Sequence, residues 1–151
     1  MSTLAGSGEF GTEDGMAASA RFFMPHAVAV DASAQVHVAD YGSANQTRLV
    51  AGGLVFTLAD DAIDFPQPKD TATDAEGNRY VADTYGNRIL KTTPAGETTV
   101  LAGTGASGDQ DGEAASATFS LPAGLAFDAL GALLVADMGN RKIRRITFGG
   151  G

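Results

Sequence analysis

The chain has 151 residues, 44% hydrophobic and 19% charged, and its formal net charge at pH 7 is −8. That length and balance fit one globular domain. The acidic charge argues against nucleic acid and anionic lipid as partners, because both need clustered Lys and Arg. The basic run at 141–145 is the exception, and on a strand such a run is expected at a solvated edge.

The absence of Cys excludes a disulfide, a thiolate nucleophile and a Cys-based zinc site. No apolar run reaches the ~18 residues that a membrane span needs, so we expect no membrane insertion. The sequence does not define the compartment in which the protein works.

A triplet, Val-Ala-Asp, occurs three times and sets the period of the chain. The copies end at Asp40, Asp83 and Asp137, and each follows a Pro-x5-Asp pattern at a constant distance. The spacings of 43 and 54 residues indicate a repeat architecture. The recurring Asp is expected to be a hydrogen-bond acceptor at the end of a strand.

Each repeat alternates short apolar runs with turn signals. In repeat 2, Asp74 and Gly77 bracket one turn, Gly86 and Asn87 form a second, and Pro94 marks a third. Four antiparallel strands in about 40 residues are typical of one blade of a β-propeller. We therefore predict an all-β protein, a β-propeller of four-stranded antiparallel blades with three blades per chain.

Two long connectors between repeats match each other in sequence. Asp14 and Asp111 stand where an N-cap would begin a short Ala-rich helical turn. Phe22 and Phe119 would then hold that turn against the core. The acidic residues of the second connector lack the distal Glu of a calcium loop, so capping is favoured over a metal.

Two repeats depart from the common pattern. In repeat 1, Gln46 is expected where repeat 2 has the apolar Ile89. In repeat 2, the first strand carries Lys69 and Asp70. The first strand of a propeller blade lines the central channel, so both residues should lie near its mouth, beside His26. Such a polar set indicates either a ligand site or a solvated channel wall.

Together these motifs resemble NHL repeats. The matching patterns are Thr-Leu-Ala-Gly, Phe-x2-Pro-x-Gly-Leu-Ala, Val-Ala-Asp and Gly-Asn-x2-Ile, and repeat 3 carries the most complete set. The resemblance implies a single NHL-repeat domain over residues 1–151. Its repeats span about 16–59, about 60–103 and about 104–148, the last completed by an N-terminal strand at 2–6. NHL propellers serve as protein- or RNA-binding platforms, as sensors and, in an amidating lyase, as an enzyme, so function does not follow from the fold.

The two ends of the chain predict how the ring closes. Residues 2–6 have the pattern of a fourth strand without a blade, and the last blade ends after its third strand. Three blades cannot close a ring, because propellers need about 4–8. We therefore expect a six-bladed homodimer in which each N-terminal strand completes the last blade of the partner. The residues assigned to this closure are Thr3, Leu4, Ala5, Ile143 and Ile146.

No catalytic set emerges, and His26 and His37 lack the spacing of a zinc site. The favoured function is a non-enzymatic scaffold without a cofactor, which assembles from half-propellers and offers a face for protein, peptide or ligand. The candidate contact residues at the channel mouth and top face are His26, Lys69, Asp70, Tyr41, Tyr85 and Met138. The alternatives are a metal-dependent lyase or lactonase-like enzyme, and a purely structural or engineered propeller fragment with no ligand.

Overall fold

The computed structural model describes residues 1–41, 46–58 and 68–148, and over these residues the protein is built from β-strands. The first sheet contains β1 (Gly15–Met16), β2 (Met24–Val30), β3 (Val36–Tyr41), β4 (Gln46–Ala51) and β5 (Leu54–Leu58). The second contains β6 (Pro68–Thr73), β7 (Arg79–Asp83), β8 (Arg88–Thr92) and β9 (Thr98–Ala102). The third contains β10 (Pro122–Phe127), β11 (Leu133–Asp137) and β12 (Lys142–Ile146), with a 3-10 turn η1 (Met138–Asn140).

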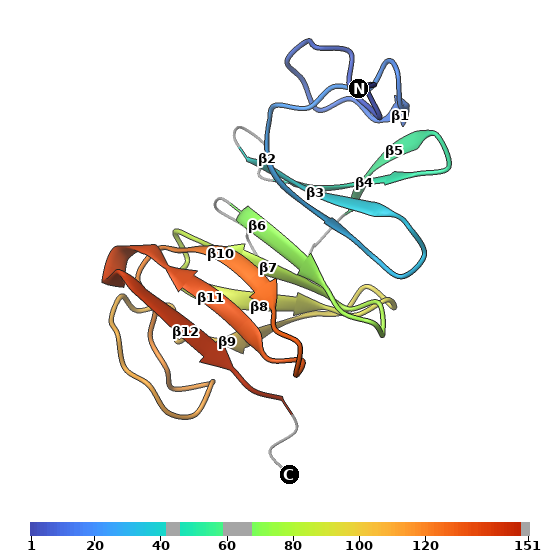
Figure 1. Cartoon of the computed structure of the whole chain (residues 1–151). Helices are drawn as coiled ribbons and strands as arrows, with labels where there is room; N and C mark the ends of the chain where they lie inside the picture. The colour runs from blue at the N-terminus through green and yellow to red at the C-terminus, as the bar shows by residue number, and fades with distance from the viewer. Residues whose placement is uncertain (42–45, 59–67, 149–151) are drawn as a thin grey trace.

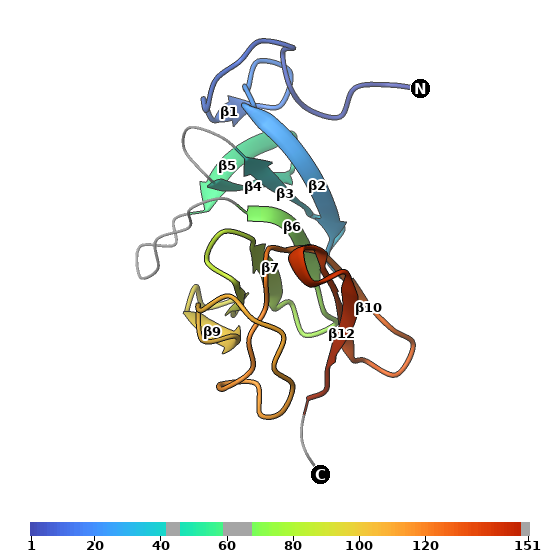
Figure 2. The ribbon, with the colours of Figure 1, turned by 90° about the vertical axis from the view of Figure 1, so that its left-hand side faces the viewer.

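All three sheets are antiparallel, with strand orders β1-β5-β4-β3-β2, β6-β7-β8-β9 and β10-β11-β12. They follow one another through the molecule, and β6 lies between β2 and β10 (Figure 1). The N-terminus and β12 lie at opposite ends of this stack in two perpendicular views (Figures 1 and 2). In the described ranges, no helix is long and apolar enough to cross a membrane.

The turn between the first two strands of each sheet forms as its Asp predicts. Asp74 Oδ1 accepts the backbone N–H groups of Glu76 (3.0 Å) and Asn78 (2.9 Å), and Asp31 and Asp128 accept the corresponding pairs. Such Asx turns fix the chain reversal locally. Because the same reversal occurs three times, the strands enter each sheet in the same register.

The apolar core is divided between the sheets. One cluster joins the second and third sheets and includes Tyr80, Ile89, Phe119 and Leu133, all at most 2% exposed. A second, smaller cluster belongs to the first sheet and its connector, where Val38 and Val55 are buried and Phe22 packs against them. The predicted anchoring of both connectors by phenylalanine is therefore confirmed.

The basic run near the C-terminus is not a solvated edge throughout, because Arg144 is 8% exposed. Its Nη1 donates to Asp137 Oδ2 at 2.9 Å, and its Nη2 donates to Asp111 Oδ1 at 2.7 Å. It also donates to the backbone carbonyls of Thr118 and Gln110. The prediction of a solvated edge is wrong for this residue, because the connector folds over it and supplies acceptors for most of its donors.

Arg48 repeats this arrangement in the first sheet, where it is fully buried. It donates to Asp40 (3.0 Å) and Asp14 (2.8 Å), and to the carbonyls of Arg21 and Glu13. Asp14 therefore binds a guanidinium and does not cap a helix, and Asp111 does the same in the third sheet. The predicted N-caps are therefore wrong, but the predicted helical turns form, since Ala20 N donates to the Met16 carbonyl and Ala117 N to the Glu113 carbonyl.

The register of the third strands also differs from the sequence prediction. Ala39 pairs with Thr47, and Ala82 pairs with Ile89. Thr47, and not Gln46, therefore occupies the position of Ile89. It is 3% exposed, so repeat 1 keeps a buried residue there despite its polar sequence. A β-branched side chain is suited to a strand, which explains why β4 forms.

Replacing Asp137 by Ala should destabilise the protein by about 3–5 kcal/mol, because removing one partner of a buried ion pair leaves the other uncompensated. Urea unfolding followed by circular dichroism measures this loss. The control is Asp109→Ala, which breaks the exposed pair with Lys142 and should leave the midpoint unchanged. Equal effects of the two substitutions would contradict a central role for the buried network.

Candidate functional site

Four of the predicted contact residues meet at one end of the inner strands. Lys69, at the start of β6, places Nζ 5.6 Å from the ring centroid of Tyr41 and 5.7 Å from that of Tyr85. A cation over two aromatic faces is held electrostatically by both rings. His26 Nδ1 lies 2.9 Å from the Lys69 carbonyl oxygen, which can only accept, so Nδ1 donates. We call His26, Lys69, Tyr41 and Tyr85 the channel-end cluster.

Asp70 follows in β6 and ties this strand to its neighbour. Its Oδ2 accepts the backbone N–H of Leu125 in β10 at 2.7 Å, and its Oδ1 accepts that of Thr71 at 2.8 Å. Burial raises the pKa of Asp70, although both hydrogen bonds and the charge of His26 act in the opposite direction. The carboxylate of Asp70 therefore positions β10 through these hydrogen bonds.

Met138 lies in η1 of the third sheet and is 48% exposed. With Gly124, Ala136 and Ile143 it lines an apolar hollow of about 370 Å³ on the open side of that sheet. Met138 thus belongs to this hollow, and the polar contacts that define the channel-end cluster do not involve it.

The residues predicted to close the ring fall into two groups. Leu4 and Ile143 are exposed, at 67% and 73%. Ile146 is 8% exposed and belongs to the core that its own chain forms between the second and third sheets. Ala5 packs against the core of the first sheet. Within one chain, residues 2–6, which include Thr3, form no strand.

Two of the recurring Asp residues act as acceptors for the incoming connector, as the sequence predicts. Asp40 Oδ1 accepts the backbone N–H groups of Phe23 (3.0 Å) and Met24 (2.9 Å), and Asp137 Oδ1 accepts that of Ser120 (2.8 Å). Among the residues that the structure describes, no group of three or more His, Asp or Glu is placed to hold a metal ion.

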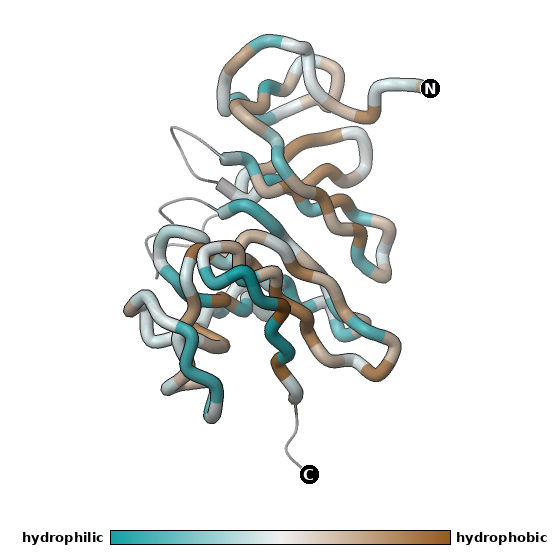
Figure 3. Tube along the Cα trace, turned by 60° about the vertical axis from the view of Figure 1, so that its left-hand side comes forward, coloured by the Kyte–Doolittle hydropathy of each residue, from teal (hydrophilic) through white to brown (hydrophobic). Residues whose placement is uncertain are grey.

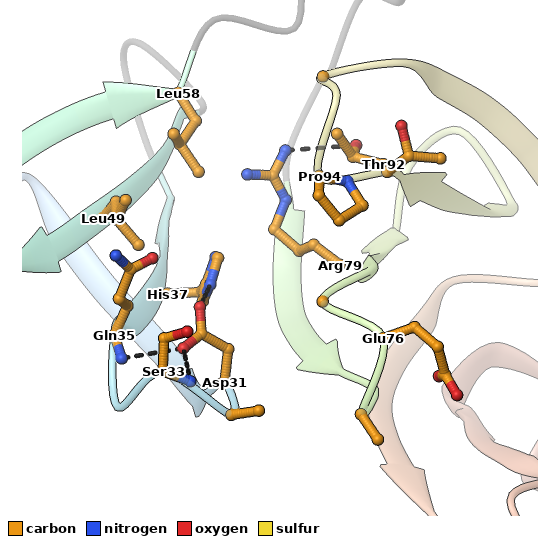
Figure 4. Close-up of a pocket in the computed structure, with 15 residues that line it drawn as sticks. Asp31, Ser33, Gln35, His37, Leu49, Leu58, Glu76, Arg79, Thr92 and Pro94 are labelled. Atoms are coloured by element: carbon orange, nitrogen blue, oxygen red, sulfur yellow. Dashed lines mark hydrogen bonds and ion pairs between the residues drawn. The ribbon is translucent and has the colours of Figure 1, made fainter.

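A cleft between the first and second sheets was not predicted. It encloses about 470 Å³ and is lined by His37 and Leu49 on one side and by Arg79 and Pro94 on the other (Figure 4). The available signal was that polar residues replace apolar ones on both walls of the same gap.

No family model matches the chain. Protein SUPPRESSOR OF QUENCHING 1, chloroplastic, from Arabidopsis thaliana is 43% identical over 77 residues, which cover 50% of this chain and 7% of that protein. The chain thus spans a small part of this curated relative.

Several solved structures share the fold. A catalytically inactive virginiamycin B lyase from Staphylococcus aureus with quinupristin has a TM-score of 0.63 at 16% identity, covering 93% of this chain and 40% of that chain. An auxiliary nutrient binding protein from Bacteroides ovatus has a TM-score of 0.64 at 20% identity, with coverages of 75% and 34%. A luciferin-regenerating enzyme has a TM-score of 0.55 at 16% identity, with coverages of 78% and 38%.

These likenesses and the three antiparallel sheets show that the chain has a β-propeller fold. The chain spans less than half of each of the three solved structures named above. At these identities the likeness extends to the fold alone, because one propeller architecture supports unrelated functions.

The carboxyl groups of Asp70 and Asp128 should titrate on opposite sides of the ordinary value of 3.8. Burial raises the pKa of Asp70, whereas the backbone N–H of Ala132 leads the contacts that lower that of Asp128. Asp70 therefore favours folding as pH falls through its raised pKa, whereas the contribution of Asp128 is lost as pH falls through its lowered pKa. Carboxyl ¹³C NMR measures both midpoints, and the reverse order would contradict the described environments.

Proposed function

We propose that this chain is a half-propeller scaffold that closes into a six-bladed ring with a second copy of itself. The observation that carries the proposal is a contrast between two equivalent isoleucines. Ile89 in β8 pairs with Ala102 of β9 and is 0% exposed, whereas Ile143 lies in β12, the edge strand of its sheet in the described part of the chain, and is 73% exposed. An open strand edge is a template for pairing with another chain.

The N-terminal segment has the features of the strand that is missing at this edge. Leu4, Ala5 and Gly6 match Leu101, Ala102 and Gly103 in sequence. Their onward hydrogen bonds also match: Gly6 N donates to the Ala17 carbonyl at 2.8 Å, and Gly103 N donates to the Ala114 carbonyl at 3.0 Å. The N-terminal segment therefore has the same position relative to the connector of the first sheet as the end of β9 has relative to the connector of the third sheet.

The segment and the edge cannot meet within one chain. They lie at opposite ends of the stack of sheets (Figures 1 and 2). A second copy related by a two-fold axis brings each segment to the edge of the other chain, which makes two identical junctions. Six NHL-like blades of four strands then follow, with residues 2–6 as the fourth strand of the blade that contains β10–β12.

The two outer faces of the stack both expose apolar side chains. Val28 and Val30 in β2 are 65% and 60% exposed, whereas their counterparts Leu125 and Phe127 in β10 pack against the core formed with the second sheet. At the other end, the apolar hollow beside Ile143 lies open. Brown and teal segments alternate along the tube that leads to the C-terminus, so this edge carries apolar as well as charged residues (Figure 3).

Ring closure would place two channel-end clusters in one protein. Each cluster combines aromatic faces with a cationic group, a composition that is common at binding surfaces. We propose that this face, with His26, Lys69, Tyr41 and Tyr85, is where the scaffold contacts a protein or peptide.

Light scattering on the purified chain should give twice the chain mass of 15.3 kDa. Deleting residues 1–8, or substituting Ile143→Asp, should give a monomer, because each removes one side of the same strand junction. Leu130→Asp is the matched control, since Leu130 is 93% exposed in the β10–β11 turn and away from the junction. A stable monomer of the parent chain would sink the proposal, as would an Ile143→Asp variant that remains dimeric.

A further inference from the structure

A slot beside β12 occupies the place that a strand fills in the first sheet. There, β5 pairs with β4 on one side and with β1 of the connector on the other. In the third sheet β12 corresponds to β4, and Gly112 and Glu113 correspond to β1, but no strand lies between them among the residues that the structure describes. A slot of about 910 Å³ is found here instead, lined by residues 111–114 and 142–147. We call it the β12 slot.

The connector beside the β12 slot already has the conformation that holds a strand in the first sheet. Gly15 and Gly112 share a φ of 124°. The turn that follows each glycine is closed by a hydrogen bond of 2.9 Å to the carbonyl four residues earlier, from Ala20 in one connector and from Ala117 in the other. The slot is therefore preformed, and a strand can enter it without the cost of refolding this connector.

In the first sheet a threonine attaches the strand to the connector. Thr57 in β5 donates its backbone N–H to Asp14 Oδ2 at 2.9 Å and its hydroxyl to Asp14 Oδ1 at 2.9 Å. The same Oδ1 accepts Arg48 Nη2 at 2.8 Å. Thr57 is also the cross-strand partner of Arg48. Asp14 thus binds both members of one cross-strand pair.

The third sheet has the arginine and the aspartate of this arrangement without the threonine. Arg144 Nε and Nη2 donate to Asp111 Oδ1 at 3.0 and 2.7 Å. In the described part of the chain, no group donates to Oδ2 of Asp111. Its side chain is 88% exposed, against 43% for Asp14. An acceptor is therefore open at the position where Asp14 binds the threonine.

The second sheet shows what accompanies a different residue in the arginine position. Leu90 occupies this position, and its cross-strand partner in β9 is Val100. Threonine thus lies opposite arginine in the first sheet, and valine lies opposite leucine in the second. This pattern predicts a threonine in the strand that pairs beside Arg144, because only there does the connector supply an acceptor for its hydroxyl.

The N-terminal segment carries this threonine. Thr3-Leu4 aligns with Thr57-Leu58 and with Val100-Leu101. We propose that the β12 slot binds residues 2–6 of a second copy, with Thr3 of that copy opposite Arg144. The backbone N–H and the hydroxyl of Thr3 donate to Asp111. The inference rests on the proposed ring closure and deepens it, because it names the contact that sets the register of each strand junction.

The first test is the dissociation constant of the dimer, measured by sedimentation of the full chain over a dilution series. Thr3→Val keeps the shape of the side chain and removes the hydroxyl. It should weaken the dimer about fivefold for each junction, and so about 25-fold for the two. Ser2→Ala is the matched control, because it removes the neighbouring hydroxyl on the opposite face of the strand and should leave the constant unchanged.

The second variant changes the acceptor. Asp111→Asn can still accept from Arg144 through its amide oxygen, but its nitrogen replaces the acceptor that Thr3 would use. It should weaken the dimer by a similar factor. Adding Thr3→Val to it should then have little further effect, since both changes remove the same contact.

The outcomes separate this contact from ring closure itself. A dimer whose constant does not change with Thr3→Val, or in which the two substitutions act additively, would retain ring closure and overturn the contact. A monomeric parent chain would overturn ring closure, and the slot is then tested by titrating the ¹⁵N-labelled full chain with an acetylated peptide of residues 1–8. Saturable shifts at residues 111–114 and 142–147, with about fivefold weaker binding of the Thr3→Val peptide, would support the contact. No shifts at these residues would overturn it.

Discussion

The buried arginine in the first and third sheets is the contact on which the architecture depends. Arg48 and Arg144 each join an Asp at the end of a middle strand to an Asp in the connector that leads into the same sheet. The interaction therefore holds a long loop over the outer strands without a helix. The cost of burying a guanidinium is offset because acidic side chains and backbone carbonyls accept its hydrogen bonds.

In the second sheet, the recurring Asp83 accepts a hydrogen bond from Arg88 Nε at 2.7 Å. Leu90 occupies the arginine position there, by its pairing with Val81, and it is fully buried. The connector that enters the second sheet is also the short one. In the first and third sheets the ion pairs therefore position the long connectors, whereas the sheets form through turns and apolar packing.

Much of the fold was predictable from the sequence, because its signals are local. The Asx turns at Asp31, Asp74 and Asp128 and the alternation of short apolar runs define hairpins without reference to distant residues. The roles of Arg144 and Asp111 were not predictable in this way, since 33 residues separate the two partners. A charged run on a strand and an Asp before an Ala-rich segment each have a more common local explanation, and in both cases tertiary contacts decided otherwise.

The candidate site also has a part that the sequence predicts and a part that it does not. Lys69, Asp70 and His26 were predicted to meet because equivalent strand positions meet in a propeller, and the structure brings them together. The cleft at His37 escaped detection because its walls come from two different sheets, so no motif within one strand indicates it.

The division of the core has a consequence for how the chain opens. The second and third sheets share one apolar cluster, whereas the cluster of the first sheet ends at its own connector. Separating the first sheet from the second exposes the polar cleft and leaves the larger cluster intact. We therefore expect the first sheet to open more readily than the other two, so that amide protons of β2 and β3 exchange while β7 and β11 stay protected.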